Sequence, residues 1–174
     1  MIFINNVLQF DAADEAATTA FGQALAQSLA AALPDGAVIA LIGPLGAGKT
    51  RLVQAVAHAA GVEPGIVASP TFVLVHEYAG LLPIYHFDAY RLKSETEFAA
   101  LGPEEYFSQR AWSFIEWADR VPNSLPPDRL EITIEPTSPT ARQFNIRALG
   151  PHHEKALAVL QRGLPNNPRS SMDH

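Results

Sequence analysis

The hydrophobic positions of this chain alternate between strand-like and helix-like stretches, which is the pattern of an α/β domain. Residues 37–42, AVIALI, form a continuous apolar run typical of a strand buried on both faces. Residues 51–61 then place their apolar side chains along one helical face and end on a glycine. Upstream, a helix is predicted from Asp11 or Asp14 to about residue 33. Its apolar stripe, which we interpret as core, consists of Phe21, Leu25, Leu29 and Leu33.

Several further strands are predicted to pair as hairpins. The runs 72–78 and 83–90 are separated by a short turn, which favours an antiparallel pair. Residues 130–134 and 143–149 alternate polar and apolar positions around a proline-broken connection, which predicts a second hairpin. Residues 1–10 read as a short strand or sheet edge. With the buried strand at 37–42, these pairs predict a mixed parallel and antiparallel sheet.

Short helices are predicted where polar caps precede apolar spacing. Residues 94–101 carry Ser94 and Glu97 at the spacing of a capping box. A second short helix is expected after Gly102 and Pro103, and a last one over 153–160. Between them, AWSFIEW at 111–117 is predicted to be a buried strand that ends in an acid.

Between the apolar strand and its helix lies GPLGAGKT, which matches the G-x-x-x-x-G-K-[ST] pattern of a phosphate-binding P-loop. Glycines let backbone amides approach an anion, and a helix that begins near Lys49 adds unpaired amides and a positive dipole end. Lys49 is expected to reach the β- and γ-phosphates of a nucleoside triphosphate, and the Thr50 hydroxyl to bind Mg²⁺. An accidental Ala/Gly-rich turn is the alternative, and the strand–loop–helix order argues against it. The predicted nucleotide-binding residues of this stretch are Gly43, Pro44, Leu45, Gly46, Ala47, Gly48, Lys49, Thr50 and Arg51.

Two acids follow strand-like apolar runs: Asp88 in IYHFDAYR and Glu116 in WSFIEW. Ligands of α/β sheets lie off the carboxyl ends of the strands, and a P-loop needs an acid there to hold Mg²⁺ or its water. A cap or salt bridge is the alternative role for either acid. Thr71 is placed to be a switch threonine that senses the γ-phosphate, although threonine is also common in strands. For Arg91, pairing with Asp88 is favoured over a phosphate contact.

Composition narrows the class of protein. The chain has 174 residues, of which 48% are hydrophobic and 17% charged, as in one ordinary globular domain. Its net charge of −6 argues against a broad basic surface for nucleic acid. The absence of cysteine excludes disulfides and thiolate catalysis and suits the cytoplasm. No signal peptide or membrane span is expected. We predict a single P-loop ATPase domain over residues 1–162 and a disordered tail over 163–174.

Four motifs in order make the chain resemble the bacterial TsaE (YjeE) family over about residues 10–150. They are GPLGAGKT, SPTF at 69–72, HFDAYRL at 86–92 and EW at 116–117. Members are small P-loop ATPases needed to make threonylcarbamoyladenosine in tRNA. The resemblance implies a three-layer P-loop NTPase-like α/β fold, ATP and Mg²⁺ as ligands, and the TsaB and TsaD proteins as partners. It also implies an ATPase that is weak alone, in which hydrolysis to ADP resets the partner complex, with no direct tRNA contact and no membrane.

The resemblance assigns roles to the phosphate-handling residues. Lys49 and Thr50 match the family's phosphate and Mg²⁺ residues, and Ser69 and Thr71 match its switch-like segment. Asp88 matches the family's other functional acid, and it is favoured as the group that positions water. Glu116 is favoured as the Mg²⁺ ligand, and which of the two acids binds the metal directly stays open.

The resemblance to the TsaE family is looser for the residues expected around the nucleotide. Trp117 is expected in the wall of the nucleotide site or on the partner surface, with core packing as the alternative. Residues Glu15–Thr18 loosely match an element near the adenine, and Arg142 a nucleotide contact.

Two rival functions remain. A P-loop small-molecule kinase would need an acceptor site and an arginine-bearing lid, for which only Arg110 is a candidate in the stretch 94–110. A nucleotide-gated binding module, in which hydrolysis is incidental, differs from the ATPase only in whether hydrolysis is needed.

Overall fold

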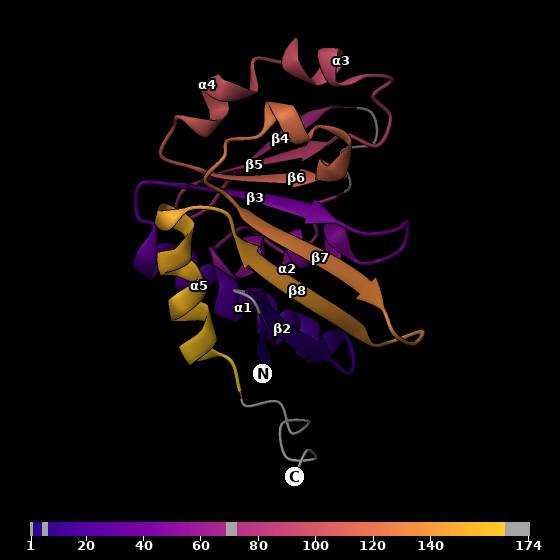
Figure 1. Ribbon diagram of the computed structural model, residues 1–174, viewed down its shortest axis with the longest axis vertical. Helices are drawn as coiled ribbons and strands as arrows, with labels where there is room; N and C mark the ends of the chain where they lie inside the picture. The colour runs from indigo at the N-terminus through magenta and orange to yellow at the C-terminus, as the bar shows by residue number, and fades with distance from the viewer. Residues whose placement is uncertain (1, 5–6, 69–72, 166–174) are drawn as a thin grey trace.

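The computed structural model describes residues 2–4, 7–68 and 73–165, and its centre is one mixed β-sheet (Figure 1). Within these residues the strands are β1 (Ile2–Ile4), β2 (Val7–Ala12), β3 (Ala37–Ile42), β4 (Val75–Ala79), β5 (Pro83–Asp88), β6 (Trp112–Glu116), β7 (Leu130–Pro136) and β8 (Arg142–Ala148). They lie in the order β1-β2-β8-β7-β3-β6-β5-β4. The central strands β7, β3, β6 and β5 are parallel, and the remaining neighbours pair antiparallel.

Helices cover both faces of the sheet, which gives three layers. They are α1 (Glu15–Ala32), α2 (Lys49–Ala59), α3 (Glu95–Ala99), α4 (Pro103–Phe107) and α5 (Pro151–Gly163). Alternate residues of β3 serve two separate cores, because side chains of a strand alternate between its faces. Ile39 and Leu41 pack with α1, α2 and α5, whereas Val38 and Ala40 belong to the core that includes Phe98 of α3. Figure 1 shows α3 and α4 well apart from α1 and α5.

Helix α1 forms as the polar and apolar pattern predicts. The Asp14 carboxylate accepts the Ala17 N–H at 2.8 Å and so caps the first turn. All four residues of the predicted stripe are fully buried. The apolar run 37–42 is β3, with the predicted bounds, and both predicted hairpins are antiparallel pairs.

Three local predictions were wrong in detail. Strand β5 ends at Asp88 instead of Tyr90, because the Asp88 carboxylate accepts the Tyr90 N–H at 2.8 Å and turns the chain. The capping box at Ser94 does not form, because the Glu97 carboxylate accepts the N–H of Lys93 at 3.0 Å. Helix α5 is longer than predicted at both ends: it begins at Pro151 and runs to Gly163.

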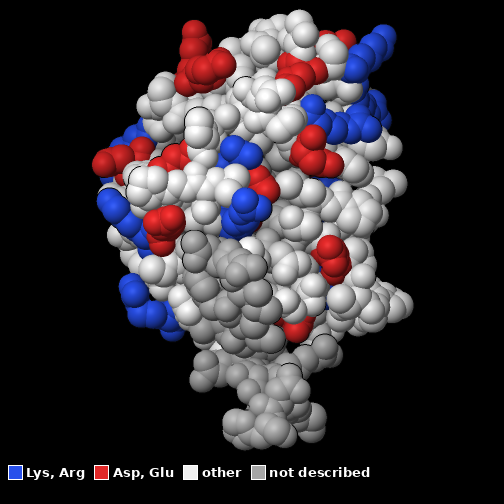
Figure 2. Space-filling model, in the orientation of Figure 1, with Lys and Arg blue, Asp and Glu red and all other residues white. Residues whose placement is uncertain are grey.

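The end of the described chain still belongs to the fold. Leu164 follows α5 and is buried in the core that α1 also helps to form. Residues 166–174, which make up most of the predicted tail, lie outside the described residues. None of the described helices has both the length and the apolar character needed to cross a bilayer. On the face shown in Figure 2, acidic and basic side chains are interspersed.

Candidate functional site

The sheet topology brings the predicted loop and both predicted acids to one edge. Parallel pairing sets Leu41 opposite Glu116 and Asp88 opposite Glu116, so β3, β6 and β5 end side by side. The glycine-rich loop at 43–48 leaves the end of β3 and leads into α2. Because all three strands are parallel, the loop, the two acids and the first turn of α2 meet at the carboxyl edge of the sheet.

Two glycines explain why the loop can take its path. At Gly43, a Cβ atom would lie 2.6 Å from the carbonyl oxygen of Ile134 on β7, closer than any side chain can approach. Gly48 has φ of 101°, in the left-handed region that glycine adopts without a steric penalty. The loop therefore turns directly into the N-terminus of α2, where unpaired backbone amides and the helix dipole favour an anion.

Lys49 is folded against the loop that precedes it. Its ammonium donates to the carbonyl oxygens of Gly43 at 2.6 Å and Pro44 at 2.9 Å, and it lies 3.9 Å from the centre of the Trp117 ring. Burial lowers the pKa of Lys49, and the negative charges of Glu116 and other nearby carboxylates oppose that shift. A cation that is 5% exposed and held by neutral carbonyls is well placed to exchange them for phosphate oxygens.

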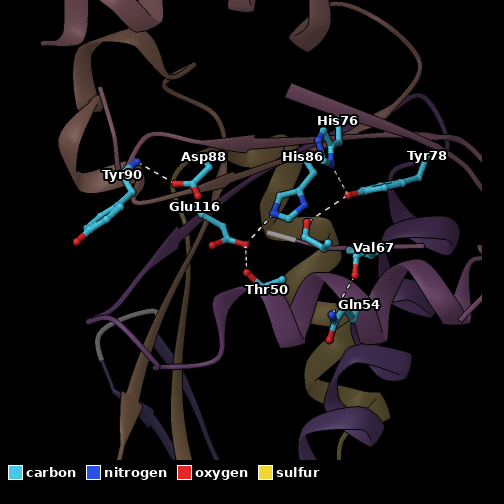
Figure 3. A network of polar contacts seen from close by, with 10 residues as sticks. Thr50, Gln54, Val67, His76, Tyr78, His86, Asp88, Tyr90 and Glu116 are labelled. Carbon is cyan, nitrogen blue, oxygen red and sulfur yellow. Dashed lines mark hydrogen bonds and ion pairs between the residues drawn. The ribbon is translucent and has the colours of Figure 1, made fainter. Parts of the chain in front are cut away.

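Thr50 and Glu116, the two residues predicted to bind metal, are in contact. The Thr50 hydroxyl donates to Oε1 of Glu116 at 2.6 Å, and the same oxygen lies 2.7 Å from Nε2 of His86 (Figure 3). Glu116 is 3% exposed, so these bonds compensate the burial of its carboxylate. Since the hydroxyl proton points to Glu116, the lone pairs of the Thr50 oxygen remain available to a cation.

Asp88 and Trp117 complete a cavity of about 400 Å³ beside the loop. It is lined by Leu45, Gly46, Ala47, Gly48, Lys49, Thr50, Arg51, Asp88, Tyr90, Arg91, Glu116 and Trp117. Most of the predicted nucleotide-binding residues thus share one cavity, and Gly43 and Pro44 contact it through Lys49. The predicted Ser69 and Thr71 lie outside the described residues.

Trp117 has an unusual backbone. Its φ of 59° is positive, which no other non-glycine residue among those described shows. Its ring packs against Tyr90, with ring centres 4.8 Å apart, and covers the Lys49 ammonium. Such strain persists only where the surroundings hold it, and it is typical of functional sites. Trp117 lines the cavity, and as a half-buried side chain it also packs against the core that includes Phe98.

The looser predictions meet in a second, smaller cavity of about 210 Å³. Glu15 and Thr18 line it together with Gly48, Arg51 and Arg142. Arg142 also donates from Nε to the carbonyl of Ala47 at 2.9 Å, so this side chain braces the glycine-rich loop from β8.

The donors at the carboxyl edge fit Mg²⁺. Thr50 and Glu116 offer a hydroxyl and a carboxylate in contact, and Asp88 is the neighbouring acid; Mg²⁺ prefers oxygen ligands. Within the described part of the chain, no group of three His, Cys, Asp or Glu residues is arranged to hold a metal alone. That is compatible with Mg²⁺, which is usually held by one or two protein groups and by substrate phosphates.

Reasoning from the sequence missed His86. It is the first residue of the HFDAYRL motif, which assigns it no role, yet it contacts Glu116 from the neighbouring strand. One signal was available: His86 stands two residues before Asp88, so both side chains point to the same face of β5.

A parallel-centred sheet with a glycine-rich loop between β3 and α2 defines a P-loop NTPase-like fold. The structure resembles a crystal structure of YdiB from Bacillus subtilis, with a TM-score of 0.75 and 32% identity over 90% of this chain and 95% of that one. The model of the family described as threonylcarbamoyl adenosine biosynthesis protein TsaE matches residues 12–144. The chain belongs to the TsaE family.

Curated relatives carry the same name, tRNA threonylcarbamoyladenosine biosynthesis protein TsaE. The protein of Bacillus subtilis is 38% identical, in an alignment that covers 80% of this chain and 87% of the relative. That of a Synechocystis strain is 42% identical over 67% and 74% of the two chains. The resemblance drawn from the four motifs is thus confirmed at the level of the family.

Proposed function

We propose that this protein binds and hydrolyses ATP with Mg²⁺ in the cytoplasm, as a component of tRNA N6-threonylcarbamoyladenosine biosynthesis that acts with TsaB and TsaD. Membership of the TsaE family supports the pathway, because the family and its curated relatives are named for that biosynthesis. The observation that carries the ATPase part is the contact between Thr50 and Glu116 beside the glycine-rich loop.

Each residue of the cavity has a distinct task in this proposal. The loop amides and the α2 N-terminus bind the triphosphate, and Lys49 exchanges the carbonyls of Gly43 and Pro44 for phosphate oxygens. Mg²⁺ would supply positive charge that offsets the charge developing on the phosphates. Thr50 and Glu116 would hold it, and Asp88 would orient the attacking water from the adjacent strand.

Weak hydrolysis by the protein alone has a physical reason. In P-loop enzymes, a positive group ordered near the γ-phosphate by a partner can raise turnover greatly. In this cavity, Lys49 is shared between loop carbonyls and the face of Trp117. We therefore propose that the partner complex completes the site.

The test is the rate of ATP hydrolysis with and without the TsaB–TsaD pair of the same organism. Wild type should be slow alone and faster with the pair, and Glu116→Gln should remove the stimulated rate. Glu135→Gln, which changes an exposed acid on β7, is the matched control and should behave as wild type.

Other outcomes would contradict the proposal. Phosphate transfer to a metabolite instead of water would favour a small-molecule kinase. If Glu116→Gln binds ATP, no longer hydrolyses it and still supports tRNA modification, the protein is a nucleotide-gated binding module. No ATP binding by wild type would remove the nucleotide part of the proposal altogether.

A further inference from the structure

His86 is a fully buried polar residue in the middle of an apolar strand. It is 0% exposed, and Ile84 and Phe114, which share its face of the sheet, are buried hydrophobic residues. A buried imidazole costs free energy unless its nitrogens are bonded, so packing alone would favour an apolar side chain here. The polar contact of its ring that compensates this cost is the 2.7 Å contact of Nε2 with Oε1 of Glu116.

The protonation of the ring follows from its partners. Nε2 faces a carboxylate oxygen, so a hydrogen bond there requires the proton on Nε2. Nδ1 is buried and has no hydrogen-bond partner among the described residues. Among the described residues, the hydrogen bond of the His86 ring is therefore made to Glu116.

The two contacts of Glu116 use the same oxygen atom. Thr50 and His86 both donate to Oε1, from α2 on one side and β5 on the other. In Figure 3 the second oxygen of Glu116 points away from His86. Glu116 also lines the cavity beside the glycine-rich loop. One oxygen is thus anchored by the protein, and the other has no donor among the described residues.

We propose that His86 is the positioning residue of the metal site: it anchors Oε1 of Glu116 and thereby holds Oε2 toward Mg²⁺ or its bound water. Hydrogen-bond partners behind a metal ligand commonly orient it and raise its affinity. This inference rests on the proposed Mg²⁺–ATP function. It adds that the fold supplies the orientation of Glu116 from a neighbouring strand, before any ligand binds.

The test compares replacements of His86 in a Mg²⁺ titration, with binding of a non-hydrolysable ATP analogue measured by calorimetry. His86→Leu should raise the Mg²⁺ concentration at half-maximal binding about tenfold, the usual cost of losing such a partner. Binding of the analogue in excess chelator should stay unchanged. His86→Gln should restore the wild-type midpoint, because its amide nitrogen is as many bonds from Cβ as Nε2 is. His86→Asn, whose amide nitrogen corresponds to Nδ1, should resemble His86→Leu.

Controls separate positioning from packing. His76→Leu replaces the histidine opposite His86 on β4, which does not bond to Glu116, and should leave the midpoint unchanged. In a Glu116→Gln background, His86→Leu should add little, because both changes remove one coupled interaction. Thermal unfolding of each variant shows whether it is folded. If His86→Leu does not fold, the difference between the Mg²⁺ midpoints of His86→Gln and His86→Asn shows whether His86 positions Glu116.

Two results would overturn the inference. One is a wild-type Mg²⁺ midpoint in folded His86→Leu, or in folded His86→Asn. The other is a raised midpoint in His86→Gln as large as in His86→Asn, which would indicate that the ring acts by its shape. Failure of wild type to bind the analogue with Mg²⁺ would instead refute the proposed function.

Discussion

The protein holds a histidine–carboxylate pair at each end of its central strands, with the same separation and different hydrogen-bond partners. At the carboxyl edge His86 lies 2.7 Å from Glu116, and at the amino edge His153 of α5 lies 2.7 Å from Asp128. In the amino-edge pair, both ring nitrogens of His153 and both oxygens of Asp128 have hydrogen-bond partners. Nε2 of His153 accepts the Val38 N–H at 3.0 Å, and the Asp128 carboxylate accepts the backbone amides at the start of α5.

Among the described residues, the carboxyl-edge pair has fewer partners. Its two bonds converge on Oε1 of Glu116, while Nδ1 of His86 has no partner among the described residues. Glu116 also lines a cavity of about 400 Å³. The same chemical pair therefore fastens a helix to the sheet when both ring nitrogens and both carboxylate oxygens are bonded inside the protein. It can serve a ligand when one carboxylate oxygen has no donor among the described residues and the carboxylate lines a cavity.

The difference between the two edges depends first on whether the carboxyl edge binds phosphate, and replacing Lys49 tests this. Lys49→Ala should weaken ATP binding about 10- to 100-fold, because a charge-assisted hydrogen bond contributes about 1.5–3 kcal/mol. Lys155→Ala, on an exposed position of α5, is the matched control and should bind as wild type. Calorimetry measures both. Unchanged affinity in Lys49→Ala would mean that the cavity is not the ATP site.

Replacing the carboxylate of each pair by an amide tests whether one pair serves stability and the other turnover. Asp128→Asn should lower the free energy of unfolding by about 2 kcal/mol, because an NH₂ group then faces backbone N–H donors, while turnover per folded molecule is kept. Glu116→Gln should do the reverse, with lost turnover and a smaller loss of stability. Urea unfolding and ATPase assays on both variants measure this. An equal loss of turnover in Asp128→Asn and Glu116→Gln would contradict the assignment of different roles to the two pairs.

The smallest expected effect is the pH dependence of stability at the amino edge. Burial lowers the pKa of His153 from 6.5, because it disfavours the charged imidazolium, and the hydrogen bond to Asp128 only partly opposes this. The unfolded chain then binds the proton more readily than the folded one. Stability should be full above pH 6.5 and fall below it until the lowered pKa is passed, by at most about 1.4 kcal/mol per pH unit.

Asp128 extends the same trend to lower pH. Burial alone would raise its pKa, but hydrogen bonds from the His153 ring and two backbone amides outweigh burial and lower it. Its contribution is present above pH 3.8 and is lost as the pH falls through the lowered value. Urea midpoints between pH 5 and 8 should flatten in His153→Gln and keep their slope in His58→Gln, an exposed control. If the urea midpoint of His153→Gln changes with pH as in wild type, groups other than His153 cause the pH dependence.

Local sequence determined much of the fold. The run AVIALI became β3 with its predicted bounds, and the α1 stripe became core, because burial periodicity acts over a few residues. The ends of elements were less predictable. Strand β5 stops at Asp88 because one carboxylate captures a backbone amide, a competition that periodicity does not reveal.

The candidate site was predictable where it is contiguous in sequence and not where it depends on strand register. Lys49 and Thr50 lie in a recognisable motif. His86 meets Glu116 only because β5 pairs with β6 in one register, across 30 residues of chain. The positive φ of Trp117 and the bond from Arg142 to the loop also arise from tertiary packing. These are the features that local patterns cannot supply.

A crystal structure with Mg²⁺ and a non-hydrolysable ATP analogue tests the central claim most directly. We expect the triphosphate within residues 43–50, Mg²⁺ about 2.1 Å from the Thr50 oxygen, and Oε2 of Glu116 bound to the metal or to its water. His86 should keep its contact with Oε1. A triphosphate bound elsewhere, or Glu116 turned away from the metal, would contradict it.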